Sequence, residues 1–499
     1  MMRIKNSLAS VAIAITFILT GCGKPAPKPK TAKEPPKKAA KAKPKPKPEL
    51  TEADAKKVAS DFFNGLVGGK YTEISALMSP QMGKALPADK LKGLWLSLSM
   101  KLGQFEAVLK TRHLKAKTSH VVTLTCGFAV APIDVRISVN PEKQVEGLFF
   151  RPAAEGVVRP QTPKAPFPYA AREVKYENKK GKIEIGGTLT VPEGKGPFPA
   201  VLLITGSGAQ DRDETIFGHK PFLVLADHLS RNGFVVLRVD DRGIGETSGN
   251  PATSTIEDHA TDVAAGVAFL RKQKEVNPKK VGLIGHSEGG VIAPMVAAKD
   301  RKIAFIVSLA GNGLTGEKVI NKQVETFFSR GTPIAPDDLK AVLKAQRAII
   351  ALVKKNASDD KLRVAIRAGV LAGAKAKNET LEEAQIKSLV EVKLKQSTYP
   401  WTKSFVKLDP AKHWRRVRCP ALVLIGEKDS QVPADENLAA VKKAAKRNKK
   451  FKAEKLASLN HLFQQAKTGT VSEYAALDET FHAPTLELIS KWIAGYTKK

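Results

Sequence analysis

Apolar residues follow a helix-then-strand order in the region between residue 51 and about residue 150. Ala53 to Leu66 and Lys90 to Met100 carry apolar positions at helical spacing. Four strand-like runs follow them, at residues 105–109, 120–124, 135–139 and 145–150. Helices that precede a curved antiparallel sheet are typical of an α+β fold. The pattern therefore predicts an α+β domain over residues 51–151.

From Arg172 onward, short apolar strands alternate with helical segments. A hairpin comes first, and the later strands are unbroken apolar runs. Such runs are expected of parallel strands that are buried on both faces. The runs are residues 200–204, 234–239, 280–284, 303–309 and 420–426. About a hundred residues of helical character separate the last two runs, too many for a plain crossover. The sequence predicts an α/β domain over residues 172–499, with a helical cap inserted at about residues 312–418.

A proline-rich segment separates the two predicted domains and is expected to form a linker over residues 152–171. Ahead of it, Gly68-Gly69-Lys70-Tyr71, Gly103-Gln104-Phe105 and Val145 to Phe149 resemble a small domain of unknown function often found before bacterial hydrolases. That resemblance implies a cone-shaped fold like nuclear transport factor 2. No catalytic set is visible in this part of the sequence.

The chain begins with a short basic stretch, the apolar run Leu8 to Thr20 and then Cys22. The run is shorter than the roughly 20 residues of a membrane-spanning helix, so residues 1–21 are predicted to be a signal peptide. Leu-Thr-Gly-Cys resembles the lipobox of bacterial lipoproteins, which implies lipidation at Cys22 and an anchor in the cell envelope. Gly23, where aspartate would favour inner-membrane retention, indicates the outer membrane in a Gram-negative host. The alternative is an ordinary secretory signal with a chance cysteine.

Residues 22–50 are rich in Lys, Pro and Ala and are predicted to form a tether. Ten lysines and two glutamates between residues 24 and 49 give this stretch a net charge of +8, which suits a negatively charged membrane surface. The whole chain carries +33, a charge balance that is also found in nucleic-acid-binding proteins. The densest later cluster, Lys442 to Lys452, has no recognition motif beside it and is interpreted as a solvated helix face. We expect no nucleic-acid partner, and the three cysteines indicate no disulfide framework.

Gly285-His286-Ser287-Glu288-Gly289 follows an apolar strand and leads into an apolar helical run. A strand that breaks at G-x-S-x-G and restarts as a helix is the nucleophile elbow of α/β-hydrolases. Small residues at Gly285 and Gly289 allow a turn tight enough to expose the Ser287 hydroxyl. Ser287 is therefore the candidate nucleophile.

A serine nucleophile needs a histidine base and an acid that orients the base. In α/β-hydrolases the acid and then the histidine follow the serine in the chain. Asp429 lies in the loop after the strand at 420–426 and is the best candidate acid, with Glu427 as the alternative. His461 lies in a loop after the last predicted strand and is the candidate base, whereas His482 begins the final helix. His286, next to the serine, is expected to point into the sheet and pack.

The tetrahedral intermediate of acyl transfer needs two N–H donors for its oxyanion. One is expected from the backbone of Glu288. The other is expected from the glycine-containing loop after residue 204, where Ser207 or Gly208 should donate. The run Asp240 to Gly249 resembles a P-loop but lacks G-K-[ST], and is interpreted as a tight loop after a strand.

Three segments together resemble one branch of bacterial α/β-hydrolases: Gly206 to Glu214, Asp240 to Gly245 and Gly285 to Gly290. The resemblance implies a carboxylesterase for short acyl esters, related to prolyl-oligopeptidase-type serine peptidases, and its triad falls on Ser287, Asp429 and His461. It implies no metal and no organic cofactor. The alternatives are a serine peptidase or amidase, and a cell-surface binding protein with a disabled hydrolase fold.

The predicted cap should lie over the carboxyl edge of the sheet, above Ser287. It contains apolar residues that could line a substrate pocket: Phe327, Phe328, Ile349, Ile350, Leu352 and Val353. The alternative is a cap packed only for stability. The sequence predicts neither the natural ester nor the oligomeric state.

Overall fold

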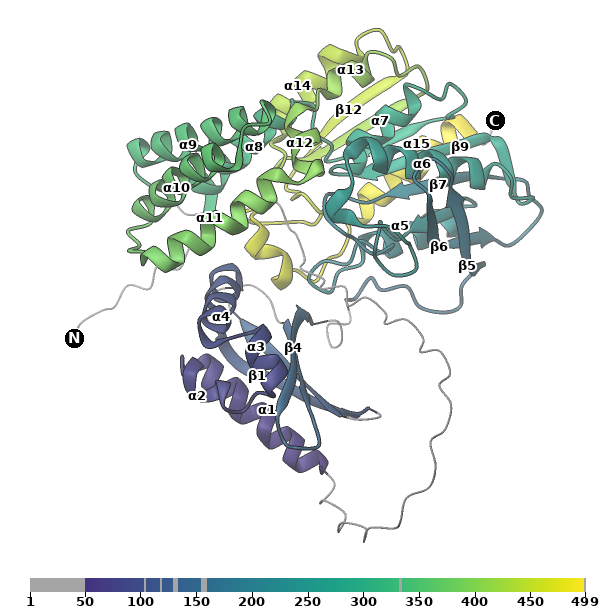
Figure 1. Cartoon of the computed structure of the whole chain (residues 1–499). Helices are drawn as coiled ribbons and strands as arrows, with labels where there is room; N and C mark the ends of the chain where they lie inside the picture. Colours follow the sequence, from purple (N-terminus) through teal and green to yellow (C-terminus); the bar gives the residue numbers. More distant parts are fainter. Residues whose placement is uncertain are drawn as a thin grey trace, which may run out of the picture.

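The computed structural model describes residues 50–102, 105–116, 119–128, 133–153, 159–331 and 334–497. The predicted signal peptide, Cys22 and the predicted tether up to residue 49 lie outside these ranges. In the described part of the chain, no helix combines the length and the apolarity needed to cross a bilayer. The described residues form a small α+β domain and a larger α/β domain (Figure 1).

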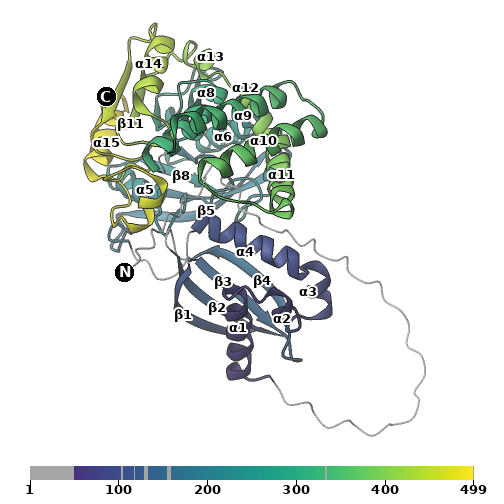
Figure 2. The same ribbon diagram turned by 90° about the vertical axis from the view of Figure 1, so that its left-hand side faces the viewer.

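In the first domain, helices pack on one face of a four-stranded antiparallel sheet (Figure 2). The helices are α1 (Glu52–Val67), α2 (Tyr71–Ser75), α3 (Pro80–Ala85) and α4 (Ala88–Leu102). The strands are adjacent in chain order: β1 (Phe105–Lys115), β2 (His120–Phe128), β3 (Ile133–Val139) and β4 (Val145–Pro152). A capping box of Thr51 and Asp54 begins α1. Phe62, Phe63 and Trp95 fill the core between helices and sheet, so the predicted α+β fold is confirmed.

The second domain is built on an eight-stranded sheet in the order β12-β11-β10-β9-β7-β8-β6-β5. Its strands are β5 (Tyr169–Asn178), β6 (Ile183–Pro192), β7 (Phe198–Ile204), β8 (Val235–Val239), β9 (Val276–His286), β10 (Ile306–Leu309), β11 (Ala421–Gly426) and β12 (Phe451–Leu456). β5, β6 and β8 pair antiparallel, and the other neighbours pair parallel. The parallel strands direct their carboxyl ends, and the loops that follow them, to one edge of the sheet.

Helices cover both faces of this sheet. One apolar core contains Leu202 and Ile204 of β7, and the other contains Val201 and Leu203, because alternate residues of a strand point to opposite faces. The elements outside the cap are α5 (Pro221–Arg231), η1 (Pro251–Thr253), α6 (Ile256–Leu270), α7 (Gly289–Ala297), α14 (Ala434–Ala445), η3 (Val471–Ala476) and α15 (Ala483–Thr497). Apolar residues of α6 and α7 belong to the first core, and those of α5 and α15 to the second. This confirms the predicted α/β-hydrolase sheet.

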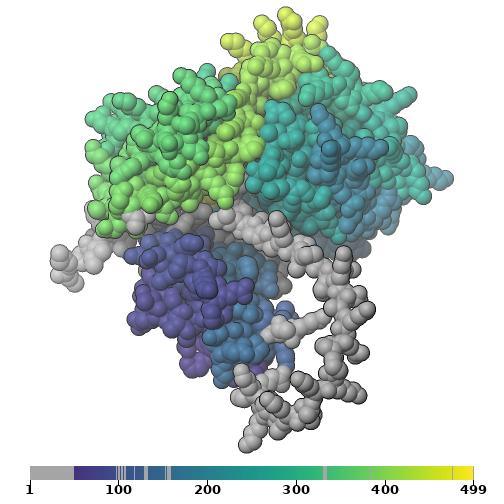
Figure 3. Space-filling model, viewed as in Figure 1, coloured from purple at the N-terminus to yellow at the C-terminus, as the bar shows by residue number. Residues whose placement is uncertain are grey.

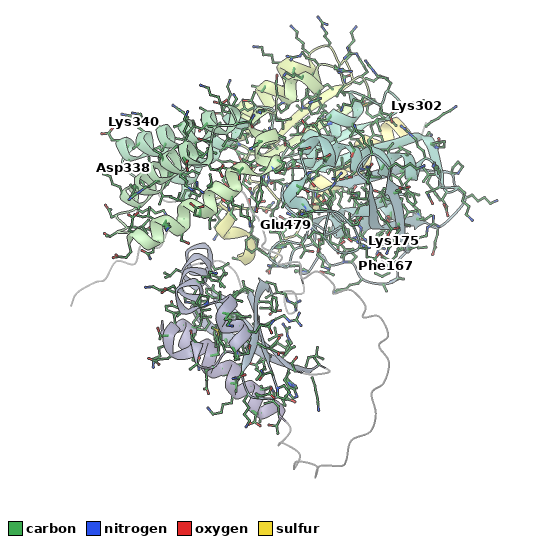
Figure 4. All side chains as sticks on the ribbon, viewed as in Figure 1. Phe167, Lys175, Lys302, Asp338, Lys340 and Glu479 are labelled. Carbon is green, nitrogen blue, oxygen red and sulfur yellow. The ribbon has the colours of Figure 1, made fainter. Side chains whose placement is uncertain are left out.

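A group of helices is inserted between β10 and β11 and forms the cap. They are α8 (Gly316–Thr326), η2 (Phe327–Gly331), α9 (Pro336–Lys354), α10 (Asp359–Ala376), α11 (Glu383–Thr398), α12 (Pro400–Lys407) and α13 (Pro410–Trp414). In the space-filling view the green cap lies directly against the teal part of the hydrolase domain (Figure 3). Asp338 and Lys340 of α9 mark the outer end of the cap (Figure 4).

Part of the proline-rich segment packs on the hydrolase domain. The Arg159 guanidinium donates to the carbonyl oxygens of Phe217 (2.7 Å) and Leu477 (2.6 Å). The Gln161 side chain accepts from the N–H of Thr480 at 2.6 Å and donates to the Phe481 carbonyl at 2.7 Å. From Arg159 onward, the segment therefore contributes to the hydrolase domain.

Candidate active site

Ser287 occupies a strained turn between β9 and α7. Its φ of 52° is in the left-handed region, which a non-glycine residue enters at an energetic cost. The Ser287 N–H donates to the Leu309 carbonyl of β10 at 2.8 Å, which fixes the turn to the neighbouring strand. The residue predicted as nucleophile thus has the backbone geometry of a nucleophile elbow.

The two glycines that flank this turn are required by close backbone contacts. A Cβ atom on Gly285 would lie 2.0 Å from the carbonyl oxygen of Gly289. A Cβ atom on Gly289 would lie 2.1 Å from the carbonyl oxygen of Ile204. Any larger residue at either position would therefore push α7 away from β9 or β7.

The structure brings Asp429 and His461 together. One Asp429 carboxylate oxygen lies 2.8 Å from His461 Nδ1, and the other accepts the N–H groups of Gln431 (2.8 Å) and Val432 (2.7 Å). Asp429 is fully buried. The alternative acid, Glu427, instead accepts the Ser458 N–H at 2.9 Å.

This pairing determines how the His461 ring can act. A carboxylate only accepts hydrogen bonds, so Nδ1 carries the hydrogen and Nε2 is left to take a proton. The His461 backbone is also fixed beside the elbow, because His286 Nε2 lies 2.9 Å from the His461 carbonyl oxygen. The residue that precedes Ser287 therefore holds the His461 backbone.

The loop after β7 lies directly against the serine. A Cβ atom on Gly206 would lie 3.3 Å from Ser287 Cβ. The Gly206 N–H is occupied, since it donates to Glu214 Oε1 at 2.6 Å. Among the described residues, no hydrogen bond uses the N–H of Ser207, Gly208 or Glu288. The three predicted oxyanion donors are thus unpaired backbone groups in the elbow and the adjacent loop.

Comparisons with known proteins agree with this architecture. The family model described as "X-Pro dipeptidyl-peptidase (S15 family)" matches residues 180–462, more than half of the 499 residues. The chain belongs to the S15 family. The first domain matches a family of unknown function, DUF3887, over residues 59–148, which agrees with the resemblance seen in the sequence.

Two curated relatives and one solved structure indicate the range of similar proteins. The chain is 29% identical to Esterase EstD of Thermotoga maritima over 271 residues, 54% of this chain and 63% of the esterase. It is 26% identical to Thiohydrolase aneE of Aspergillus aculeatus over 170 residues, 34% of this chain and 46% of that protein. The matched region is less than two thirds of either relative. A solved esterase of Pyrococcus furiosus aligns with 69% of this chain and 97% of its own at 14% identity, with a TM-score of 0.43.

This S15-family site contains a buried pair that sequence reasoning missed. Glu214 Oε1 lies 2.8 Å from His286 Nδ1, and the same oxygen accepts the Gly206 N–H. Burial opposes the charged form of His286, but the Glu214 carboxylate, the His461 carbonyl and the Asp429 charge together favour it, and the pKa of His286 is raised. His286 does pack inside, as predicted, but it also connects the loop after β7 to His461.

The Asp240 to Gly249 run anchors the same loop. The Asp240 carboxylate accepts the Arg212 backbone N–H at 2.9 Å and its guanidinium at 2.6 Å. The Asp241 carboxylate accepts the Gln210 N–H at 2.9 Å and the Thr205 hydroxyl at 2.8 Å. Aspartates in a turn after β8 thus hold the loop that carries Ser207 and Gly208.

Three of the six apolar residues predicted to line a pocket are buried inside the cap. Ile350 and Val353 of α9 are each 2% exposed and belong to the apolar core that α10 and α11 share. Phe328 is also buried and packs edge-on against Phe327. Ile350 and Val353 therefore have a packing role in the structure instead of the expected role as pocket lining.

Among the described residues, no cluster of three or more His, Cys, Asp or Glu side chains could hold a metal ion.

Proposed function

We propose that this protein is a serine hydrolase that cleaves carboxylic esters of short acyl chains through an acyl-enzyme intermediate. The observation that carries the proposal is the buried Asp429–His461 pair, hydrogen-bonded at 2.8 Å beside the strained elbow of Ser287. The similarity of the chain to Esterase EstD also supports carboxylic esters as the substrate class.

In the proposed reaction, Ser287 Oγ attacks the ester carbonyl carbon while His461 Nε2 takes the serine proton. The N–H of Glu288 and that of Ser207 or Gly208 stabilise the oxyanion. The tetrahedral intermediate collapses, and His461 donates the proton to the leaving alkoxide. Water, deprotonated by His461, then hydrolyses the acyl-enzyme and restores Ser287.

A second candidate is a serine peptidase or amidase, because the S15 family takes its description from X-Pro dipeptidyl-peptidases. The same triad could cleave either bond, so only substrates distinguish them. The test compares p-nitrophenyl esters from acetate to decanoate with X-Pro p-nitroanilides. The proposal predicts the largest kcat/KM for short esters. Preferential cleavage of X-Pro anilides would establish the peptidase instead.

We also propose that the protein is anchored in the cell envelope through lipid on Cys22. The apolar run, the cysteine and the basic tether support this. Two or more acyl chains give stable membrane attachment, so Cys22→Ser should release the protein from the membrane fraction or stall its processing. Unchanged membrane association and unchanged mass of that variant would contradict the anchor.

A further inference from the structure

Glu288 has a buried side chain that the proposed reaction does not use. Only its backbone N–H is needed as an oxyanion donor, yet its carboxylate is inside the protein with 3% of the side chain exposed. Burial of a carboxylate is unfavourable unless hydrogen bonds compensate. A negative charge at the start of α7 could be explained by the helix dipole, but Glu288 forms no side-chain cap on that helix.

The carboxylate is held from two different parts of the domain. Glu288 Oε2 accepts the indole N–H of Trp401, in cap helix α12, at 2.6 Å. Glu288 Oε1 lies 2.9 Å from Nδ1 of His259, in α6. We call Trp401, Glu288 and His259 the Glu288 bridge. It joins a cap helix and a sheet-covering helix to the residue that follows Ser287.

The cap end of this bridge is held by two further contacts. The Trp401 ring stacks on Phe405 of the same helix, with centroids 4.9 Å apart and planes at 13°. Ser404, also in α12, accepts the backbone N–H of Ile256, which begins α6, at 3.2 Å. A displacement of α12 would therefore pull on both partners of Glu288 together.

We propose that Glu288 is a positioning residue: its side chain orients its own backbone N–H, the expected oxyanion donor. Through Trp401, the geometry of the oxyanion site then depends on the position of cap helix α12. The proposal rests on the proposed hydrolase function. It assigns the cap a part in organising the reaction site through one side chain, in addition to any contact that the cap makes with substrate.

Three variants test the bridge in the full chain. Trp401→Phe keeps the stacked ring but removes the N–H donor to Glu288. Loss of a whole oxyanion donor reduces kcat by about 10² to 10³. A donor that is only less well oriented should cost less, so kcat for p-nitrophenyl butyrate should fall about tenfold, with a KM change of less than about twofold. Glu288→Ala should lower kcat about a hundredfold. Glu288→Gln can still accept from Trp401 and donate to His259, so it should retain kcat within about threefold.

The double variant Glu288→Ala/Trp401→Phe should be no slower than Glu288→Ala alone, because Trp401 acts through Glu288. Trp492→Phe is the matched control: this tryptophan lies in α15, packs against Tyr496 and contacts the apolar core on the opposite face of the sheet. Multiplied losses in the double variant, or a Glu288→Gln variant as slow as Glu288→Ala, would overturn the proposal.

Amide hydrogen exchange on the same variants measures the bridge without substrate. Glu288→Ala should accelerate exchange both in residues 286–292 and in α12, whereas Trp492→Phe should leave both unchanged. If Glu288→Ala accelerates exchange in both segments but the wild-type protein hydrolyses no ester, only the proposed function is refuted. Normal ester hydrolysis with unchanged exchange and kcat in the bridge variants would refute only the bridge.

Discussion

Replacing Glu214 with alanine should impair the hydrolase from a position behind the reaction site. One carboxylate oxygen of Glu214 holds both the Gly206 N–H, at 2.6 Å, and His286 Nδ1, at 2.8 Å. Glu214 is 4% exposed, so water cannot readily replace it. Removal leaves the buried His286 Nδ1 and the part-buried Gly206 N–H without this acceptor. It also frees the loop that carries Ser207 and the contact of His286 with His461.

The size of the effect follows from these two hydrogen bonds. Removing one partner of a buried ion pair destabilises a protein by about 3–5 kcal/mol, and we expect that loss of unfolding free energy for Glu214→Ala. Displacement of one oxyanion donor should also lower kcat by about 10². Glu214→Gln keeps an oxygen that can accept both donors, so it should lose about 1–2 kcal/mol and retain kcat within about tenfold.

The assay combines urea unfolding with hydrolysis of p-nitrophenyl butyrate under native conditions. Glu275→Gln is a suitable control, since Glu275 pairs with Arg172 at the start of β9, at the other end of that strand from Ser287. That variant should keep normal kcat. A stable Glu214→Ala enzyme with normal kcat would refute the role that we assign to the Glu214–His286 pair.

Three further predictions concern the triad, stability and the domain boundary. Ser287→Ala should reduce kcat by about 10⁵-fold or more, and Asp429→Ala somewhat less, with unchanged circular dichroism; near-normal turnover of either variant would refute the triad. Burial lowers the pKa of His219 to about 4, so the unfolded chain takes up a proton near pH 6.5 while the folded protein does not. The free energy of unfolding should therefore fall by about 2 kcal/mol between pH 7 and pH 5. The melting temperature of His219→Gln should depend less on pH, and a pH dependence equal to that of the wild type would contradict this. A chain of residues 159–499 should melt at a higher temperature than one of residues 168–499, which keeps all of β5, because only the longer chain has the hydrogen bonds of Arg159 and Gln161; equal melting temperatures would show that these bonds do not stabilise the domain.

The sequence predicted the fold, and it placed the candidate site residues at one sheet edge, because these signals are local. The unbroken apolar runs that became β7, β9 and β11 report burial on both faces, and the G-x-S-x-G turn reports a close backbone approach. The acid and the histidine each follow a strand, so their positions at one sheet edge could be inferred without knowledge of side-chain contacts.

The supporting residues could not be predicted because their partners are distant in the chain. Glu214 and His286 are 72 positions apart, and Glu288 and Trp401 are 113 apart. Nothing in the periodicity of either segment selects that partner. The sequence favoured Asp429 but left Glu427 open as the acid, because both follow β11 within three residues, and the hydrogen bond of Asp429 to His461 distinguishes them.

Reaction of the purified protein with a fluorophosphonate, followed by peptide mass mapping, tests the central claim most directly. An activated serine attacks the phosphorus and retains the phosphonyl group, whereas an ordinary surface serine does not react. We predict one stoichiometric adduct on Ser287, formed at least about a hundredfold more slowly in His461→Ala, where the base is missing. An unlabelled wild-type protein, or an adduct at another residue with Ser287 unmodified, would contradict the assignment of Ser287 as the nucleophile.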